Sequence, residues 1–350
     1  MNEIIPPFNF QEVIVEPWTI LGSEHVWVVL MGFLVTATCG SIGVYLILRR
    51  MALVGDAISH SVLPGLAVAF LAASLVAGSG AAAGGQMVEA AATGAHHNFR
   101  NPTLMFFGAL AAGILTTMLI EVIHKKSRVK QDAAIGITFS SLFAIGVILI
   151  SVFADKVDLD ADCVLYGEIG QVAPFFSPMV EVGGVGIGTW PVVRMGTVAL
   201  LTGLVIVFFY KELLVSSFDS GLAASLGINP TFVHYALMCW LSVVVVSSFE
   251  AVGAILVVAM LILPGATASL LSHRMGSIFL IVILHSALSA ITGLHLGYWL
   301  NVPIAGAMVV MGVCFFTLAW MFSPSQGLLT RWLRLRVNST SRQPAPEPGS

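Results

Sequence analysis

Two ionisable side chains, Asp56 and His60, stand four residues apart inside an apolar part of the sequence. On a helix this spacing puts both on one face, about 6 Å apart along the axis. A carboxylate and an imidazole are frequent ligands of divalent transition metals. The pair therefore indicates half of a metal site. The alternative is that the two side chains bond only each other, or cap a helix near its end.

Pro64 follows the same pair by one helical turn. A proline has no N–H to donate, so the carbonyl of His60 would lose its helical hydrogen bond. Transport sites use such weakened helices beside polar groups. Pro264 is a second proline within an apolar run, and we expect a helix break there as well.

Three further ionisable residues could face a transport pathway. Ser247 and Glu250 have the spacing of a capping box, with Ser247 as the N-cap of a helix. A pathway role for Glu250 is the alternative. His285 and His295 lie ten residues apart, roughly on one side of a single apolar segment. Either could line a pore, and a satisfied core histidine explains each of them equally well.

The composition sets the class of protein that must position these residues. Of the 350 residues, 57% are hydrophobic and 9% are charged, whereas soluble domains carry about 25% charged residues. The mean hydropathy is +0.96. These values exclude a soluble enzyme, a coiled coil, a disordered chain and a disulfide-rich secreted domain. The net charge of −3 does not suggest a nucleic-acid partner. We therefore expect a polytopic membrane protein in contact with lipid.

A membrane-spanning helix needs about 20 mostly apolar residues, and runs of this kind predict an all-α bundle of eight or nine spans. With the N-terminus outside, 12 of the 15 basic residues fall on the cytoplasmic side, as the positive-inside rule requires. The expected spans are residues 26–48, 53–75, 103–121, 133–153, 194–210, 232–249, 251–271, 277–297 and 303–322.

The remaining segments do not resemble spans. Residues 1–25 are expected to form an extracytoplasmic N-terminal segment that precedes the transmembrane domain, residues 26–323. Within it, residues 76–101 are a Gly-rich insertion, expected to be mobile. Residues 154–193 form an outer loop with four acidic residues near its start, which would raise the local cation concentration. The tail, 324–350, has the composition of a disordered segment.

A moderately polar segment on the cytoplasmic side, residues 211–230, is too short to span. Asp219 fits the N-cap of a short helix that Gly227 ends. A short helix between spans is well placed to dock a partner, and a plain connecting helix is the alternative. The sequence contains no Gly-x-x-x-x-Gly-Lys-Ser/Thr motif, so we expect no nucleotide hydrolysis by a P-loop of this chain.

Four blocks of the sequence resemble, in order, the permease subunits of metal-ion ABC importers, the zinc/manganese/iron (ABC-3) family. They are 49–71 (RRMALVGDAISHSVLPGLAVAFL), 127–151, 210–230 and 252–271 (VGAILVVAMLILPGATASLL). The resemblance covers residues 27–323. It implies the type II permease fold of vitamin B12 and metal-chelate importers. It also implies a multi-pass protein of the bacterial cytoplasmic membrane.

The resemblance further implies a separate cytoplasmic ATPase, an extracytoplasmic solute-binding protein and a second permease chain, identical or related. Asp56 and His60 match the family's intramembrane metal site. Phe218, Asp219, Ala223 and Gly227 match its ATPase-docking segment. The block at 157–170 is more like the manganese/iron branch, so manganese is expected first, then iron, then zinc. The rival classes are an ion-coupled secondary transporter, which would need no ATPase, and a membrane-embedded enzyme.

Overall fold

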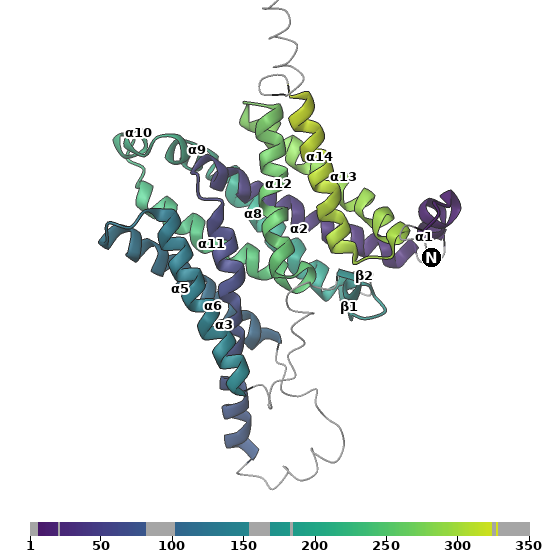
Figure 1. Ribbon diagram of the computed structural model, residues 1–350, viewed down its shortest axis with the longest axis horizontal. Coiled ribbons are helices and arrows are strands. Elements are labelled where there is room, and N and C mark those ends of the chain that lie inside the picture. Colours follow the sequence, from purple (N-terminus) through teal and green to yellow (C-terminus); the bar gives the residue numbers. More distant parts are fainter. Residues whose placement is uncertain are drawn as a thin grey trace, which may run out of the picture.

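The computed structural model describes residues 6–19, 22–81, 102–153, 169–182, 185–323 and 327. The described chain is almost entirely helical (Figure 1). Its elements are η1 (Gln11–Val15), α1 (Glu16–Thr19), α2 (Gly22–Leu48), α3 (Leu53–Ala81), α5 (Pro102–Lys126), α6 (Gln131–Phe153), η4 (Ile169–Val172), β1 (Met179–Val182), β2 (Val185–Thr189), α8 (Trp190–Phe208), α9 (Tyr210–Phe218), α10 (Ser220–Ser225), α11 (Pro230–Val252), α12 (Ala254–Leu271), α13 (Met275–Leu300) and α14 (Ile304–Phe322).

The all-α membrane fold predicted from the sequence is confirmed. Eight helices of the described chain are long and apolar enough to cross a membrane. The remaining expected span, 53–75, coincides with α3. Among the described side chains, the continuous apolar part of this helix is Leu53–Ala69. Helix α3 continues to Ala81, so the first residues assigned to the 76–101 insertion are helical.

The bundle has two sides joined through α2 and α11. Helices α3, α5 and α6 pack on one another on one side, and α12, α13 and α14 on the other (Figure 1). Helix α2 packs along α12 and α13, whereas α11 contacts α5, α3 and α2. About half of the residues of α2 are buried, so this helix forms the centre of the core. Helices α3 and α12 also contact each other directly, so the two sides are connected by α2, by α11 and by this contact.

Small residues let the helices approach closely, as is usual in membrane bundles. A Cβ atom on Gly43 of α2 would overlap the carbonyl of Leu261 on α12. At the crossing of α3 and α5, a Cβ atom on Gly65 would lie 2.5 Å from the carbonyl oxygen of Gly108. The tightest contacts in the bundle therefore depend on the absence of a side chain.

The boundary between the sixth and seventh spans corrects the capping-box prediction. Helix α11 runs through Ser247 and Glu250 to Val252, and Gly253 alone separates it from α12. Gly253 has a positive φ of 76°, a backbone conformation that glycine adopts at a lower cost in free energy than residues with a side chain. Ser247 lies inside the helix, where its hydroxyl donates to the carbonyl of Val243 at 2.7 Å. It does not cap a helix, because the glycine rather than a polar cap makes the turn.

The outer loop contains structure that the sequence did not reveal. Strands β1 and β2 form an antiparallel hairpin with an irregularity after Val180, and η4 precedes them. The acidic residues expected at a cation entrance lie within 154–168, outside the described residues. The same is true of residues 82–101 of the insertion and of the tail apart from residue 327.

Candidate metal site and docking segment

Asp56 and His60 lie in the first two turns of α3 and face each other. His60 Nε2 is 3.4 Å from Asp56 Oδ1. An ion with ligands about 2.1 Å away places neighbouring ligands roughly 3.0 to 3.4 Å apart, so one ion fits between these two atoms. The direct pairing that was the alternative interpretation is present as well. Asp56 is the more open of the two, with 42% of its side chain exposed.

Two aromatic rings of α6 hold the imidazole of His60. Its centroid lies 5.0 Å from that of Phe139 and 5.8 Å from that of Phe143. Nδ1 of His60 is buried without a hydrogen-bond partner among the described residues. The two rings pack around the imidazole while its Nε2 lies towards Asp56, so the pair presents one nitrogen and one oxygen side by side.

Pro64 lies within α3, one turn beyond His60, and Pro264 lies within α12. Each faces a glycine of a neighbouring helix. A Cβ atom on Gly146 of α6 would lie 2.8 Å from Pro64 Cδ, and one on Gly40 of α2 would lie 2.9 Å from Pro264 Cβ. Both helices continue through their prolines, so the helix breaks expected at Pro64 and Pro264 are absent. The neighbouring helix therefore approaches at the turn where the regular hydrogen bonding is interrupted.

The other candidate ligands do not join this pair. His285 is buried in α13, its ring edge against Phe315 of α14, and α13 packs on α2, α12 and α14. His295 is satisfied, because Trp18 donates to its Nε2 at 3.3 Å and its Nδ1 lies 2.9 Å from the carbonyl of Val13. Across the described residues there is no group of three or more His, Cys, Asp or Glu side chains that could hold a metal.

Glu250 lies in the last turn of α11. Its side chain is outside what the structure describes, so a pathway role for it stays a prediction.

The segment expected on the cytoplasmic side, residues 211–230, contains two short helices rather than one, α9 and α10. Asp219 separates them and caps α10, because its Oδ1 accepts hydrogen bonds from the N–H groups of Gly221 at 2.8 Å and Leu222 at 3.0 Å. Gly227 ends the segment with φ 81°. The predicted cap and stop are confirmed. Ala223 of α10 is fully buried, whereas Phe218 at the end of α9 is 66% exposed and Leu222 of α10 is 51% exposed. Helix α10 therefore packs on its neighbours α9 and α11, and the two short helices present apolar side chains outward.

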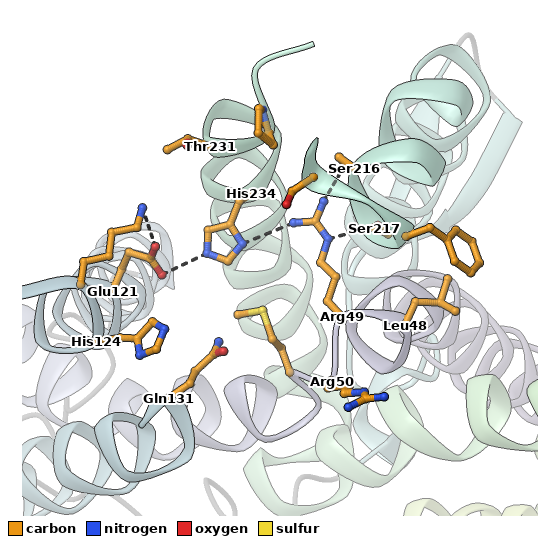
Figure 2. A pocket seen from close by; sticks show the side chains of 15 residues that line it. Leu48, Arg49, Arg50, Glu121, His124, Gln131, Ser216, Ser217, Thr231 and His234 are labelled. Atoms are coloured by element: carbon orange, nitrogen blue, oxygen red, sulfur yellow. Dashed lines mark hydrogen bonds and ion pairs between the residues drawn. The ribbon is translucent and has the colours of Figure 1, made fainter. Parts of the chain in front are cut away.

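A polar network at the inner end of the bundle was not predicted. The guanidinium of Arg49, at the end of α2, donates to Ser216 Oγ at 2.8 Å and Ser217 Oγ at 3.1 Å on α9 (Figure 2). Its third nitrogen lies 3.3 Å from Nδ1 of His234 on α11. His234 Nε2 lies 3.1 Å from Glu121 Oε2 on α5. Burial lowers the pKa of Arg49, which remains charged because an arginine's ordinary pKa exceeds about 12.

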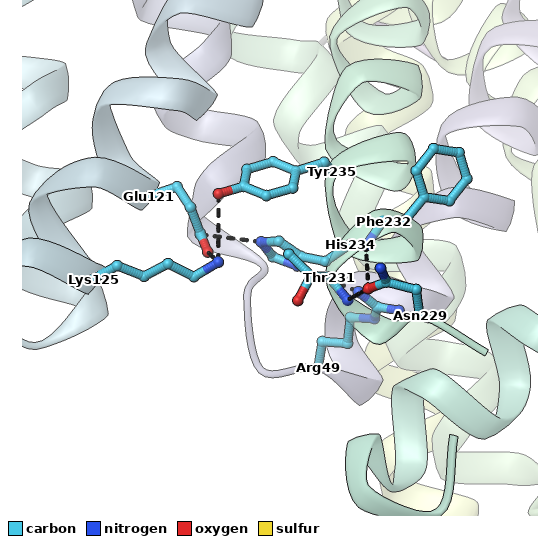
Figure 3. Close-up of polar contacts among 8 residues, drawn as sticks. All are labelled: Arg49, Glu121, Lys125, Asn229, Thr231, Phe232, His234 and Tyr235. Atoms are coloured by element: carbon cyan, nitrogen blue, oxygen red, sulfur yellow. Dashed lines mark hydrogen bonds and ion pairs between the residues drawn. The ribbon is translucent and has the colours of Figure 1, made fainter. Parts of the chain in front are cut away.

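Local structure positions His234 and Glu121 for this contact. The side chain of Asn229 caps α11 by accepting from the N–H groups of Thr231 and Phe232, which sets His234 in the second turn (Figure 3). Glu121 is buried and also accepts from Lys125 Nζ at 2.7 Å. The i,i+4 spacing of Glu121 and Lys125 is a sequence signal for that pair. The contact of Glu121 with His234, which is 113 residues away in the sequence, has no such signal.

The network lines a cleft of about 570 Å³ that opens at this end. Its walls come from the turn after α2, the end of α5, α9 and the start of α11 (Figure 2). Phe218 of α9 and Arg50 are also among its lining residues. The cleft therefore lies between α9 and α5, with Arg49 bonded to α9 and, through His234, linked to Glu121 of α5.

The fold defines a multi-pass helical membrane protein with two short helices, α9 and α10, between its spans. A model of the ABC 3 transport family matches residues 24–323, so the chain belongs to that family. The sequence is 42% identical to the manganese transport system membrane protein MntD of Bacillus subtilis, over 89% of this chain and 96% of the relative. It is 36% identical to the zinc transport system membrane protein TroD of Treponema pallidum, over 89% of this chain and 77% of the relative.

Among solved structures, the chain is similar to PsaBC from Streptococcus pneumoniae in complex with Fab. The TM-score is 0.67 and the identity 31%, covering 94% of this chain and the whole of the matched chain. The resemblance stated from four sequence blocks is therefore confirmed, and so is the permease fold. The multi-pass bacterial membrane location agrees with the eight apolar helices and with bacterial relatives.

Proposed function

We propose that this chain is the membrane subunit of an ABC importer for a divalent transition metal, with manganese preferred over iron and zinc. The observation that carries the proposal is the Asp56–His60 pair, held at 3.4 Å on one face of α3. A charged residue within a membrane helix is costly and marks a substrate pathway by default. The pair offers an oxygen and a nitrogen ligand, which suit all three metals.

Manganese is preferred because the relative at 42% identity and several others are named as manganese transport or import proteins, while one is named for zinc and one for iron. The chemistry of the pair agrees without deciding the matter. A carboxylate favours the harder Mn²⁺ and an imidazole is accepted by all. Selection among the metals then depends on the number of ligands and on the rest of the pathway.

Asp56 and His60 supply only two ligands, so we propose that the site is completed from elsewhere. The carbonyl of His60, which Pro64 leaves without its helical donor, is one source of a further oxygen. A second permease chain facing the first would add its own Asp56 and His60. Water would fill the remaining positions of an octahedral ion.

We assign α9 and α10 to docking of the ATPase, which is a separate chain. Phe218 and Leu222 are exposed at 66% and 51% on the inner face, and Asp219 holds α10 in place. The buried Ala223 lets α10 lie close to the bundle, and Gly227 turns the chain into α11. At the opposite end, an extracytoplasmic solute-binding protein would deliver the metal.

The test is uptake by the purified complex in proteoliposomes. The chain is co-purified with its cognate ATPase and supplied with the cognate binding protein and Mn²⁺, Fe²⁺ or Zn²⁺. Uptake that requires ATP hydrolysis and is fastest with Mn²⁺ is expected. An ATPase-inactive Walker variant is the control. Uptake that persists without the ATPase under an ion gradient would refute the proposal in favour of a secondary transporter.

A further inference from the structure

Arg49 is placed to connect three elements through one side chain. All three of its guanidinium nitrogens have partners: Ser216 and Ser217 of α9, and His234 of α11. The planar fork of an arginine can direct its donors to several acceptors at once, which a lysine cannot reproduce. Arg49 thus joins the end of α2 both to α9 and to the start of α11.

The link from Arg49 to the metal-site helix is short and stiff. Only four residues separate α2 from α3, and Arg50 adopts a left-handed conformation with φ 58°. The N–H of Met51 bonds the carbonyl of Leu46 at 2.9 Å, and the N–H of Val54 bonds the carbonyl of Met51 at 3.1 Å. Met51 is buried. A displacement of Arg49 is therefore passed to α3, where Asp56 lies in the first turn.

The other arm of the network anchors Arg49 to α11 and α5. Because an arginine only donates, Nδ1 of His234 must accept from Arg49, and the proton of the neutral ring lies on Nε2. That N–H then donates to Glu121, whose other oxygen accepts from Lys125. Lys125 also lies over the ring of Tyr235, 4.9 Å from its centroid. The anchor is a directed chain of hydrogen bonds in which every charged group has a partner.

The contact of Arg49 with α9 can be released without leaving α9 unsatisfied. The hydroxyls of Ser216 and Ser217 accept from Arg49, and both donate to the carbonyl of Leu213 at 3.3 and 2.6 Å. If Arg49 withdraws, those donated bonds remain. The guanidinium would then meet the open cleft, where water can hydrate it. Release of the contact therefore leaves no hydroxyl of α9 without a hydrogen bond, a condition that a switching element must meet.

We infer that Arg49 is the coupling residue between ATPase docking and the metal site. Movement of α9 and α10 makes or breaks its bonds to Ser216 and Ser217 and so shifts the start of α3, which carries Asp56 and His60. The inference rests on the proposed function, since it needs an ATPase at α10 and a metal at α3. Arg49 is a positioning residue, because it contacts neither.

The experiment compares three variants in the reconstituted complex with Mn²⁺. Arg49→Lys keeps the charge and loses the fork. Ser216→Ala/Ser217→Ala removes only the two acceptors on α9 and favours helix. Arg50→Lys is the matched control, because Arg50 is exposed on the same turn and the same cleft. The readouts are co-purification of the ATPase, basal ATP hydrolysis, hydrolysis stimulated by manganese-loaded binding protein, and uptake.

For Arg49→Lys and the double serine variant we expect uptake and stimulation to fall about tenfold, the effect of losing a charge-assisted hydrogen bond. Co-purification and basal hydrolysis should stay within about twofold of the wild type, a pattern that a merely structural role would not give. Arg50→Lys should behave as the wild type.

Full stimulation in both test variants overturns the inference, and so does a proportional loss of assembly, basal hydrolysis and uptake. If Arg49→Lys fails to assemble, the serine variant decides, because it leaves Arg49 intact. A wild-type complex without ATP-dependent uptake refutes the proposed function instead. The two failures can be told apart, because the inference about Arg49 fails when the wild-type complex transports manganese and the variants transport it equally well.

Discussion

Gly146 of α6 lies directly against the ring of Pro64 on α3. A Cβ atom built on Gly146 would be 2.8 Å from Pro64 Cδ and 2.9 Å from its nitrogen, closer than side chains approach. Pro64 stands one turn beyond His60, and the same helix α6 supplies the rings of Phe139 and Phe143 that hold the imidazole. The spacing of α3 and α6 at this glycine therefore sets the surroundings of the candidate metal site.

The first prediction is that Gly146→Ala disturbs the site through this contact. Overpacking should cost about 1–3 kcal/mol and move the two phenylalanine rings away from His60. We expect a lower unfolding temperature of the purified complex and slower manganese uptake. Gly136→Ala on the same helix is the matched control, since nothing lies within 4 Å of a Cβ there and alanine favours helix by about 1 kcal/mol. Equal unfolding temperatures for the two variants would contradict this reading of the packing.

The second prediction concerns the metal ligands. Asp56→Asn and His60→Gln keep the size of each side chain but remove the charge or the imidazole. We expect at least about tenfold weaker manganese binding and uptake, the scale seen when a metal site loses an essential contact. Binding is measured as metal retained by the purified complex, and co-purification of the ATPase should not change.

Ser59→Ala is the control for these two variants. Ser59 lies between Asp56 and His60 in the sequence, and its side chain is buried. Its hydroxyl donates to the carbonyl of Gly55 at 3.0 Å. Its replacement should leave uptake near the wild-type level. Unchanged uptake in the Asp56→Asn/His60→Gln double variant would reject the site and leave membership of the family untouched.

Much of the fold could be predicted because the membrane imposes long apolar helices and places basic residues on one side. Local chemistry also sufficed for α10, since an aspartate cap and a glycine stop act within a few residues. Ser247 shows the limit of such motifs. Its spacing to Glu250 fits a cap, but α11 continues to Gly253, because the positive φ available to glycine determines where the chain turns.

Contacts between distant residues were beyond sequence patterns. Nothing near His234 indicates that it meets Glu121 and Arg49 from two other helices. In the same way, the sequence left His295 open between a pore residue and a satisfied histidine, and only the contacts of its two ring nitrogens with Trp18 and the carbonyl of Val13 favour the second. Periodicity gives the face of a helix, whereas the partner on that face depends on how the helices cross.

The third prediction tests the cap of α10. Asp219→Ala removes the acceptor for two N–H groups and should destabilise this short helix by about 1 kcal/mol. We expect less ATPase to co-purify with the chain. Asp219→Asn retains an acceptor and should preserve most of the complex, while Ser225→Ala, whose hydroxyl bonds only Leu222 at 2.8 Å, should have no effect. If the Asp219→Asn and Asp219→Ala variants retain equally little ATPase, the charge of Asp219 rather than its helix cap supports docking.

The last prediction separates the two arms of the network at His234. In His234→Asn the amide oxygen can take the place of Nδ1, so Arg49 keeps its acceptor while Glu121 loses a donor. In His234→Gln the amide nitrogen can take the place of Nε2, so Glu121 keeps its donor while Arg49 loses its acceptor. If the anchoring of Arg49 carries the coupling, Gln should reduce manganese-stimulated ATP hydrolysis about three- to tenfold, the value of one such bond. Asn should stay near the wild type. A larger loss with Asn would instead place the coupling in the contact between His234 and Glu121, which holds α11 against α5.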